Sequence, residues 1–134
     1  MNMGKVVQKK EITEADFFSG IFAVLALRNH TELFDNRALQ TGLAKIFQEF
    51  SKYAKQSGVE MRFRIRLHPF HSDSAVIHHG ILSAEQRGII RFNGLRNIII
   101  ICLTKEMAEE MLNSIDQGKL FSDFAERIIY ILSY

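Results

Sequence analysis

One segment of this chain alternates strictly between apolar and polar residues, from residue 59 to residue 68. The apolar members are Val59, Met61, Phe63, Ile65 and Leu67. A period of two predicts a β-strand with one buried face. The opposite face carries Arg62, Arg64 and Arg66 in a row. The rest of the chain shows longer helical patterns, so the fold must combine α-helices with at least one β-strand.

Five other stretches repeat apolar residues at helical spacing. Helix 13–28 is apolar nearly all round, which predicts burial in the middle of the fold or at a subunit interface. A second helix follows Asp35 or Asn36, either of which can cap it, and ends near Gly58. Residues 74–87 predict a third helix, with a short strand over 75–82 as the alternative. The fourth and fifth helices span about 104–118 and 120–134.

The dipeptide Asn93-Gly94 between two apolar runs predicts a β-hairpin. A two-residue turn at this point would place Arg91 directly opposite Arg96. Like charges in that arrangement destabilise a hairpin. A bound anion would relieve the repulsion, and so would a nearby glutamate or a longer loop that shifts the register.

The predicted fold class is therefore α+β, with about five helices and a small, largely antiparallel sheet. The 134 residues, of which 47% are hydrophobic, suffice for one domain with a core that needs neither a disulfide nor a metal. We expect residues 1–12 to form a flexible N-terminal arm. The single cysteine, Cys102, lies in an apolar run, which predicts a small buried side chain rather than a catalytic thiolate.

No signal peptide or membrane-spanning pattern is visible, so we expect a cytoplasmic protein with no membrane partner. Residues 59–103 carry six arginines and three acidic residues, whereas residues 104–134 carry six acidic and three basic residues. Alternate strand positions are about 6.6 Å apart, close to the roughly 7 Å between successive phosphates. The strand arginines could therefore bind phosphates, or they could discourage edge-to-edge aggregation.

From Leu39 to Leu103 the expected order is helix, strand, helix and hairpin, and the third helix ends in the step QRGII at residues 86–90. This resembles the later part of winged-helix domains, in which a recognition helix leads through an Arg-Gly-apolar step into the wing. The family's first two helices would come from residues 13–57. The resemblance implies binding of double-stranded DNA, with helix 74–87 in the major groove and the turn at 93–94 near the backbone.

A helical wheel over 74–87 turns His78, His79 and Gln86 outward, where glutamine could read adenine. An ordinary amphipathic helix explains the same pattern. The candidate nucleic-acid-binding residues are Arg62, Arg64, Arg66, His78, His79, Gln86, Arg91 and Arg96.

Four histidines, His68, His71, His78 and His79, fall within twelve residues and could converge on zinc. No cysteine lies among them, and the spacing matches no metal motif with a known mechanism. We therefore expect no metal, no cofactor and no catalytic residue. The expected function is a non-catalytic DNA-binding or regulatory domain. A protein-interaction subunit of a larger assembly is the alternative, and a metal-dependent enzyme is a third.

The first and last helices carry more apolar surface than one small domain would be expected to cover. This predicts a two-fold homodimer through the terminal helices, because symmetric dimers are the commonest closed assembly. The alternative is that the two helices bury each other within one subunit.

Overall fold

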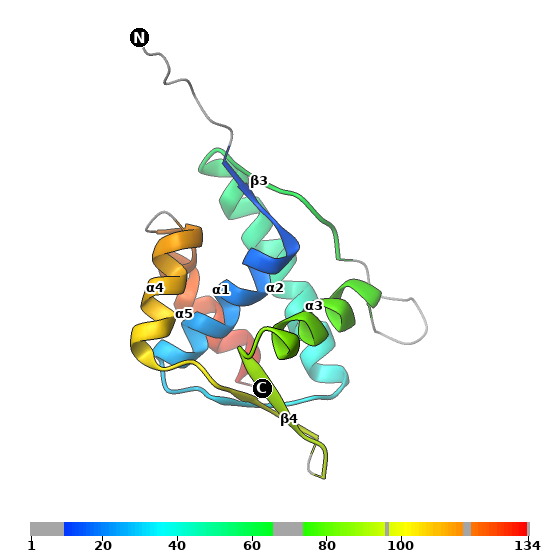
Figure 1. Ribbon diagram of the computed structural model, residues 1–134. Coiled ribbons are helices and arrows are strands. Elements are labelled where there is room, and N and C mark those ends of the chain that lie inside the picture. The colour runs from blue at the N-terminus through cyan, green and yellow to red at the C-terminus, as the bar shows by residue number, and fades with distance from the viewer. Residues whose placement is uncertain (1–9, 66–73, 96, 117–118, 134) are drawn as a thin grey trace.

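The computed structural model describes residues 10–65, 74–95, 97–116 and 119–133 (Figure 1). The elements in chain order are β1 (Lys10–Ile12), α1 (Glu14–Leu27), β2 (Glu32–Phe34), α2 (Arg37–Gln56), β3 (Val59–Met61), α3 (Ala75–Gln86), β4 (Ile90–Asn93), β5 (Ile98–Ile101), α4 (Lys105–Asp116) and α5 (Leu120–Leu132). The α+β prediction is confirmed, with the predicted hairpin inside a three-stranded antiparallel sheet.

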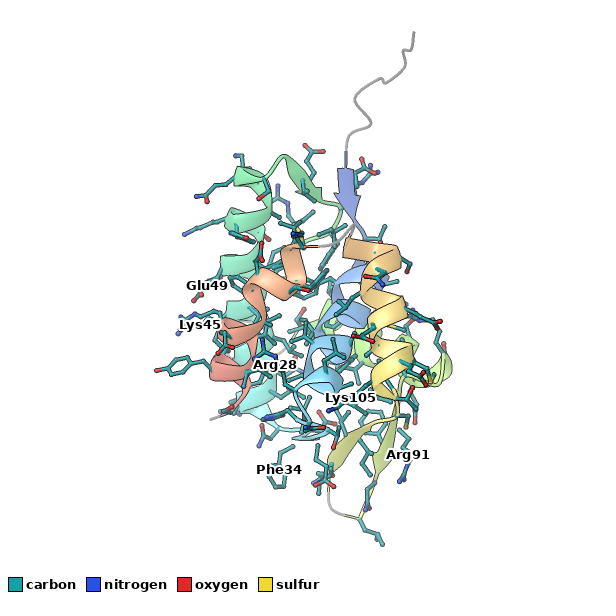
Figure 2. All side chains as sticks on the ribbon, turned by 90° about the vertical axis from the view of Figure 1, so that its left-hand side faces the viewer. Arg28, Phe34, Lys45, Glu49, Arg91 and Lys105 are labelled. Carbon is teal, nitrogen blue, oxygen red and sulfur yellow. The ribbon has the colours of Figure 1, made fainter. Side chains whose placement is uncertain are left out.

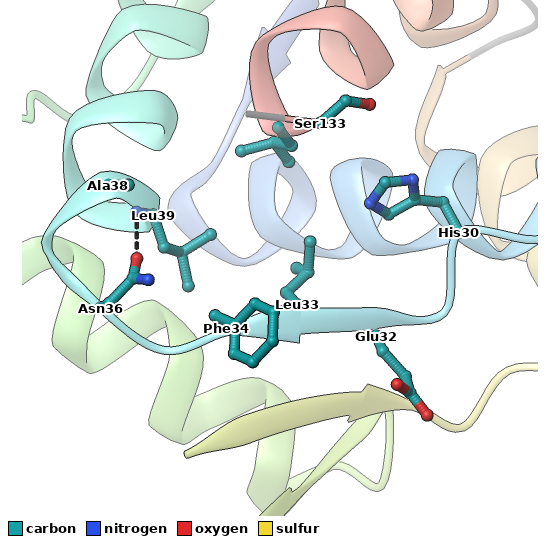
Figure 3. A pocket seen from close by; sticks show the side chains of 9 residues that line it. His30, Glu32, Leu33, Phe34, Asn36, Ala38, Leu39 and Ser133 are labelled. Carbon is teal, nitrogen blue, oxygen red and sulfur yellow. Dashed lines mark hydrogen bonds between the residues drawn. The ribbon is translucent and has the colours of Figure 1, made fainter. Parts of the chain in front are cut away.

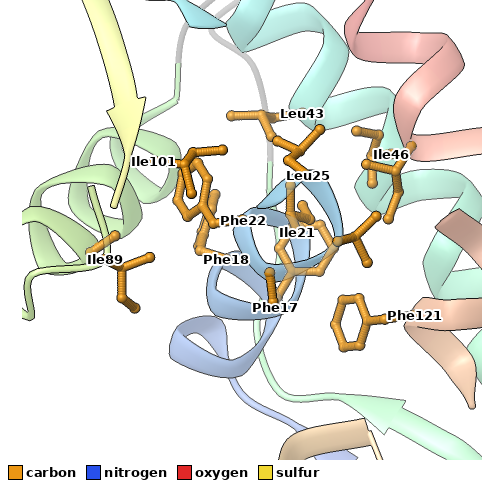
Figure 4. Packing of buried hydrophobic residues seen from close by; sticks show 14 of the residues in the cluster. Phe17, Phe18, Ile21, Phe22, Leu25, Leu43, Ile46, Ile89, Ile101 and Phe121 are labelled. Carbon is orange, nitrogen blue, oxygen red and sulfur yellow. The ribbon is translucent and has the colours of Figure 1, made fainter. Parts of the chain in front are cut away.

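Helix α1 runs through the centre of the fold, where α3, α4 and α5 pack around it. Every residue from Phe17 to Ala26 is buried within the single chain. Figure 4 shows Phe18 and Phe22 directed toward Ile89 and Ile101 on one side of α1, and Phe121 on another side. Helix 13–28 was expected either in the middle of the fold or at a subunit interface, and the first of these is correct. The predicted dimer assumed that α1 leaves apolar surface uncovered, and that assumption is wrong.

Helix α2 is amphipathic and packs against α5 and β3, and its rings Phe47 and Phe50 contact Phe17 of α1. Its N-cap is Asn36 rather than Asp35, because the Asn36 side chain accepts a hydrogen bond from the backbone N–H of Leu39 at 3.1 Å. Leu43, Ile46 and Phe50 are buried on its inner face. The helix ends at Gln56, close to the expected stop at Gly58, whose φ of +79° favours glycine.

The three-stranded sheet has the order β2-β5-β4, and its strand β2 was not predicted. Asn93 pairs with Ile98, so four residues rather than two close the hairpin, and Arg91 stands opposite Ile100. The predicted pairing of Arg91 with Arg96 is therefore wrong, and the longer loop accounts for it. Burial sets this register, because it places Ile90 and Ile101, both in the core, opposite one another.

The strand predicted over residues 59–67 is too long. The β3 ladder ends at Met61 because its parallel partner β1 contributes only three residues before α1 begins. Burial still alternates beyond the ladder, with Ile65 buried and Arg62 and Arg64 exposed. Residues 10–12 form a strand, so the expected flexible arm is wrong for them, and residues 1–9 lie outside the described residues.

Residues 75–86 form a helix, which excludes the alternative strand, and Ser74 caps it. Helices α4 and α5 lie where predicted. Cys102 is exposed, and the prediction of a buried side chain is wrong. It follows β5, and the alternation of an extended chain turns its side chain outward between buried Ile101 and buried Leu103. None of the helices in the described part of the chain is long and apolar enough to span a membrane.

Candidate nucleic-acid interface

The predicted site residues lie at opposite ends of the molecule. Arg62 and Arg64 follow β3 at one end, and Arg91 lies on β4 at the other, as both views show (Figures 1 and 2). Arg62 and Arg64 therefore do not share a surface with Arg91, because β3 pairs with β1 instead of joining the sheet of β4 and β5. Arg66 and Arg96 lie outside the described residues.

The two strand-segment arginines differ in their surroundings. Arg62 Nη1 donates to Glu11 Oε2 at 2.5 Å. The parallel pairing of β1 with β3 brings these two side chains together across the ladder. Arg64 is exposed and makes no ion pair with a carboxylate of the described residues. Arg64 therefore remains available to an anion, whereas the charge of Arg62 is largely balanced.

The outward face of α3 carries the predicted recognition residues but few charges. His78, His79 and Gln86 are all exposed. His79 Nδ1 lies 2.6 Å from Glu14 Oε2 at the start of α1, so this ring is occupied by an intramolecular contact. The cations beside this face are Arg87 at the end of α3 and Arg91 on β4.

A stronger concentration of positive charge lies on α2, where the sequence pattern indicated only a solvent-facing side. Its exposed cations are Arg37, Lys45, Lys52 and Lys55. At 3.6 residues per turn they fall within an arc of roughly 80°, and they extend about 27 Å along the helix. None of the four makes an ion pair with a carboxylate in the described part of the chain. The sequence did carry a signal for this row: no acidic residue falls within the arc of the helical wheel that these four cations occupy.

The single acidic residue of α2, Glu49, lies near Lys45 and Lys52, but its carboxylate is bound by an arginine of another helix. Arg127 of α5 binds its carboxylate through two hydrogen bonds, from Nε at 2.6 Å and from Nη2 at 2.8 Å. The hydrogen bonding by Arg127, aided by its charge and by those of Lys45 and Lys52, lowers the pKa of Glu49. Figure 2 shows Lys45 and Glu49 on the side of the molecule away from α4.

Lys55 leads from this row into a groove of about 850 Å³ between the C-terminal half of α2 and residues 58–64. Arg62 and Arg64 also line the groove, as do the rings of Phe47 and Phe63. We call Arg37, Lys45, Lys52, Lys55 and Arg64 together the basic surface. Two acidic residues, Glu11 and Glu60, lie at the same groove.

A smaller pocket of about 270 Å³ lies between β2, the start of α2 and the end of α5 (Figure 3). Leu33, Leu39 and Leu132 contribute apolar walls, and Phe34 stands at its edge with 66% of its surface exposed. The side-chain oxygen of Asn36 is already used in capping α2. His30, Glu32 and Ser133 line the rest of the pocket, so an apolar side chain that enters it would contact the three leucines.

Within the described residues, no three His, Cys, Asp or Glu side chains gather closely enough to hold a metal ion. His68 and His71, two members of the predicted cluster, lie outside those residues. Comparison of the chain with models of protein families, with curated proteins and with solved structures gives no match. Function must therefore be argued from the surface itself.

Proposed function

We propose that this chain is a non-catalytic, cytoplasmic nucleic-acid-binding domain that holds a phosphate backbone on the basic surface. The observation that carries the proposal is the row of exposed cations along α2, none of which makes an ion pair with a carboxylate of the described residues. Each lysine or arginine that meets a phosphate releases bound counterions, and this release supplies most of the affinity of sequence-independent binding. A row about 27 Å long can meet several phosphates at once.

The winged-helix resemblance supports a second mode of binding by the same domain. Helices α1 and α2 lie within residues 13–57, and α3 leads through Arg87 and Gly88 into the β4–β5 hairpin. In this mode α3 would enter the major groove of DNA. The connection from α2 to α3 contains β3, however, and is longer than the short turn of a helix-turn-helix. The α3 face also offers fewer cations, so we assign the backbone contacts to the basic surface.

A salt titration of binding to labelled DNA, followed by fluorescence anisotropy, tests the proposal. Replacing Lys45, Lys52 and Lys55 together by glutamine should weaken binding at low salt. It should also reduce the slope of log K against log salt by about 2 to 3, because each lost phosphate contact contributes about 0.7 to 0.9. Glutamine keeps helix propensity and bulk, so the fold should be unaffected.

The matched control removes three cations elsewhere, at Arg87, Arg91 and Lys105. It should leave affinity and salt slope close to those of the wild type. If only this control variant lost affinity, the nucleic acid would be bound by α3 and the hairpin instead, as the winged-helix mode requires. No salt-dependent binding by the wild type would refute the proposed function.

The second candidate function is protein interaction, and the occupant we propose is a second copy of this chain. Phe34 is an exposed ring beside an apolar pocket, and a two-fold axis lets each copy insert its ring into the pocket of the other. This interface differs from the expected terminal-helix dimer, because it uses β2 in place of the first helix and keeps only the end of α5. Light scattering at micromolar concentration tests it, because Phe34→Ser should then halve the measured mass.

A further inference from the structure

We infer that the groove beside α2 accepts unpaired bases, so that the preferred ligand is single-stranded nucleic acid. This rests on the proposed function and specifies its substrate class. The groove volume of about 850 Å³ is within the range of pockets that enclose small organic ligands. It can admit a few exposed bases, whereas the bases of an intact duplex are stacked inside the helix and cannot enter it.

Two aromatic rings line the groove and remain partly exposed. Phe47 and Phe63 are half-buried, and their ring centroids are 5.1 Å apart. Phe17, which is fully buried, supports both from behind, with centroids 5.8 Å from Phe47 and 5.3 Å from Phe63. The two rings are therefore held in place before any ligand binds. Rings of this kind stack with bases of any sequence.

Cations stand where a backbone would run past those rings. Lys55 and Arg64 line the same groove and are exposed, and Lys55 continues the row of cations along α2. A positively charged groove with aromatic platforms is the arrangement that binds single strands without sequence preference. Arg62 is balanced by Glu11, and Glu60 opposes phosphate, so Lys55 and Arg64 carry the local attraction.

The chain turns sharply to build this groove. Gly58, with its positive φ, reverses the direction between α2 and β3, so that residues 59–64 run back beside the C-terminal half of the helix. The alternation of burial then turns Phe63 toward the protein and Arg62 and Arg64 toward solvent. All three side chains nevertheless line the groove, with the ring half-buried and the two cations exposed.

The test compares a labelled 12-nucleotide thymidine strand, a uridine strand of equal length and a 12-base-pair duplex at one salt concentration. The single strands should bind at least ten-fold more tightly than the duplex. Phe63→Leu removes the ring face but keeps an apolar side chain. It should weaken single-strand binding about 5- to 150-fold, the equivalent of 1–3 kcal/mol per stacked base. Its salt slope and its duplex affinity should be unchanged.

Phe124→Leu is the matched control, because Phe124 is also half-buried but packs against Phe50 and Tyr53 rather than lining the groove. It should bind like the wild type. If Phe63→Leu unfolds, Arg64→Gln replaces it, since this exposed side chain is not part of the core. Arg64→Gln should lower single-strand affinity and reduce the salt slope by about 0.7.

Equal binding of strand and duplex, with no effect of either groove variant, would overturn the inference and leave the proposed function standing. Absence of binding to all three nucleic acids would end both.

Discussion

Gly80 of α3 lies directly against the ring of Phe18 in α1. A Cβ atom at Gly80 would stand 2.2 Å from Cε2 of that ring and 2.3 Å from Cδ2, closer than real side chains approach. Phe18 is completely buried and packs edge-on against Phe17. The glycine therefore lets α3 approach the central helix, and the β4–β5 hairpin that follows α3 is positioned with it.

Gly80→Ala should destabilise the protein by about 1–2 kcal/mol. Overpacking a core costs about 1–3 kcal/mol, and the better helix propensity of alanine returns up to about 1 kcal/mol. Urea unfolding measures the difference. Gly94→Ala is the control, because a Cβ there meets no atom within 4 Å. A Gly80→Ala protein as stable as the wild type would contradict the close packing.

Glu49→Gln should reduce stability at neutral pH but not in acid. Arg127 lowers the folded-state pKa of Glu49 from its ordinary value of 4.5. The pair therefore contributes its full stability above about pH 4.5, and this is lost as the pH falls through the lowered pKa. Both side chains are about one-third exposed, so we expect at most about 1 kcal/mol.

Urea unfolding at several pH values should thus show a gap between the free energies of unfolding of wild type and Glu49→Gln, and this gap should close in acid. Glu106→Gln, an exposed residue of α4 without an ion pair among the described residues, should show no such pH-dependent gap. A gap for Glu49→Gln that persists unchanged at low pH would mean that the carboxylate charge is not its source.

Asn36→Ala should cost about 1 kcal/mol of stability, because it removes the side-chain acceptor for the Leu39 N–H at the start of α2. Asp35→Ala is an informative control. The sequence allowed either residue as the cap, but the structure uses Asn36. Thermal unfolding should therefore distinguish the two variants, and equal losses would argue against the assigned cap.

Cys102 should react with a thiol reagent such as dithionitrobenzoate in the folded protein. Its side chain is exposed, and its contact with the Ile100 carbonyl oxygen is a long one at 3.6 Å. One thiol per chain should be modified without denaturant. A thiol that reacts only after unfolding would instead support the burial inferred from its apolar sequence neighbours.

The sequence alone determined the helices, because their signals are local. The all-round apolar pattern of residues 13–28 predicts a central helix, and the spacing of Leu39, Leu43 and Ile46 predicts the amphipathic one after it. The alternation at 59–67 also predicted correctly which side chains turn inward up to Ile65. These patterns depend only on the periodicity of the backbone.

Only the tertiary structure decided which strands pair and which charges meet. Strands β1 and β2 have three residues each, too few for a period to be recognised, and they form because partners distant in sequence reach them. Glu49 and Arg127 are 78 residues apart, yet their pairing balances the one carboxylate of α2. The basic surface and its groove arise in the same way, because Gly58 and β1 bring residues 59–64 beside α2, and no local pattern specifies that contact.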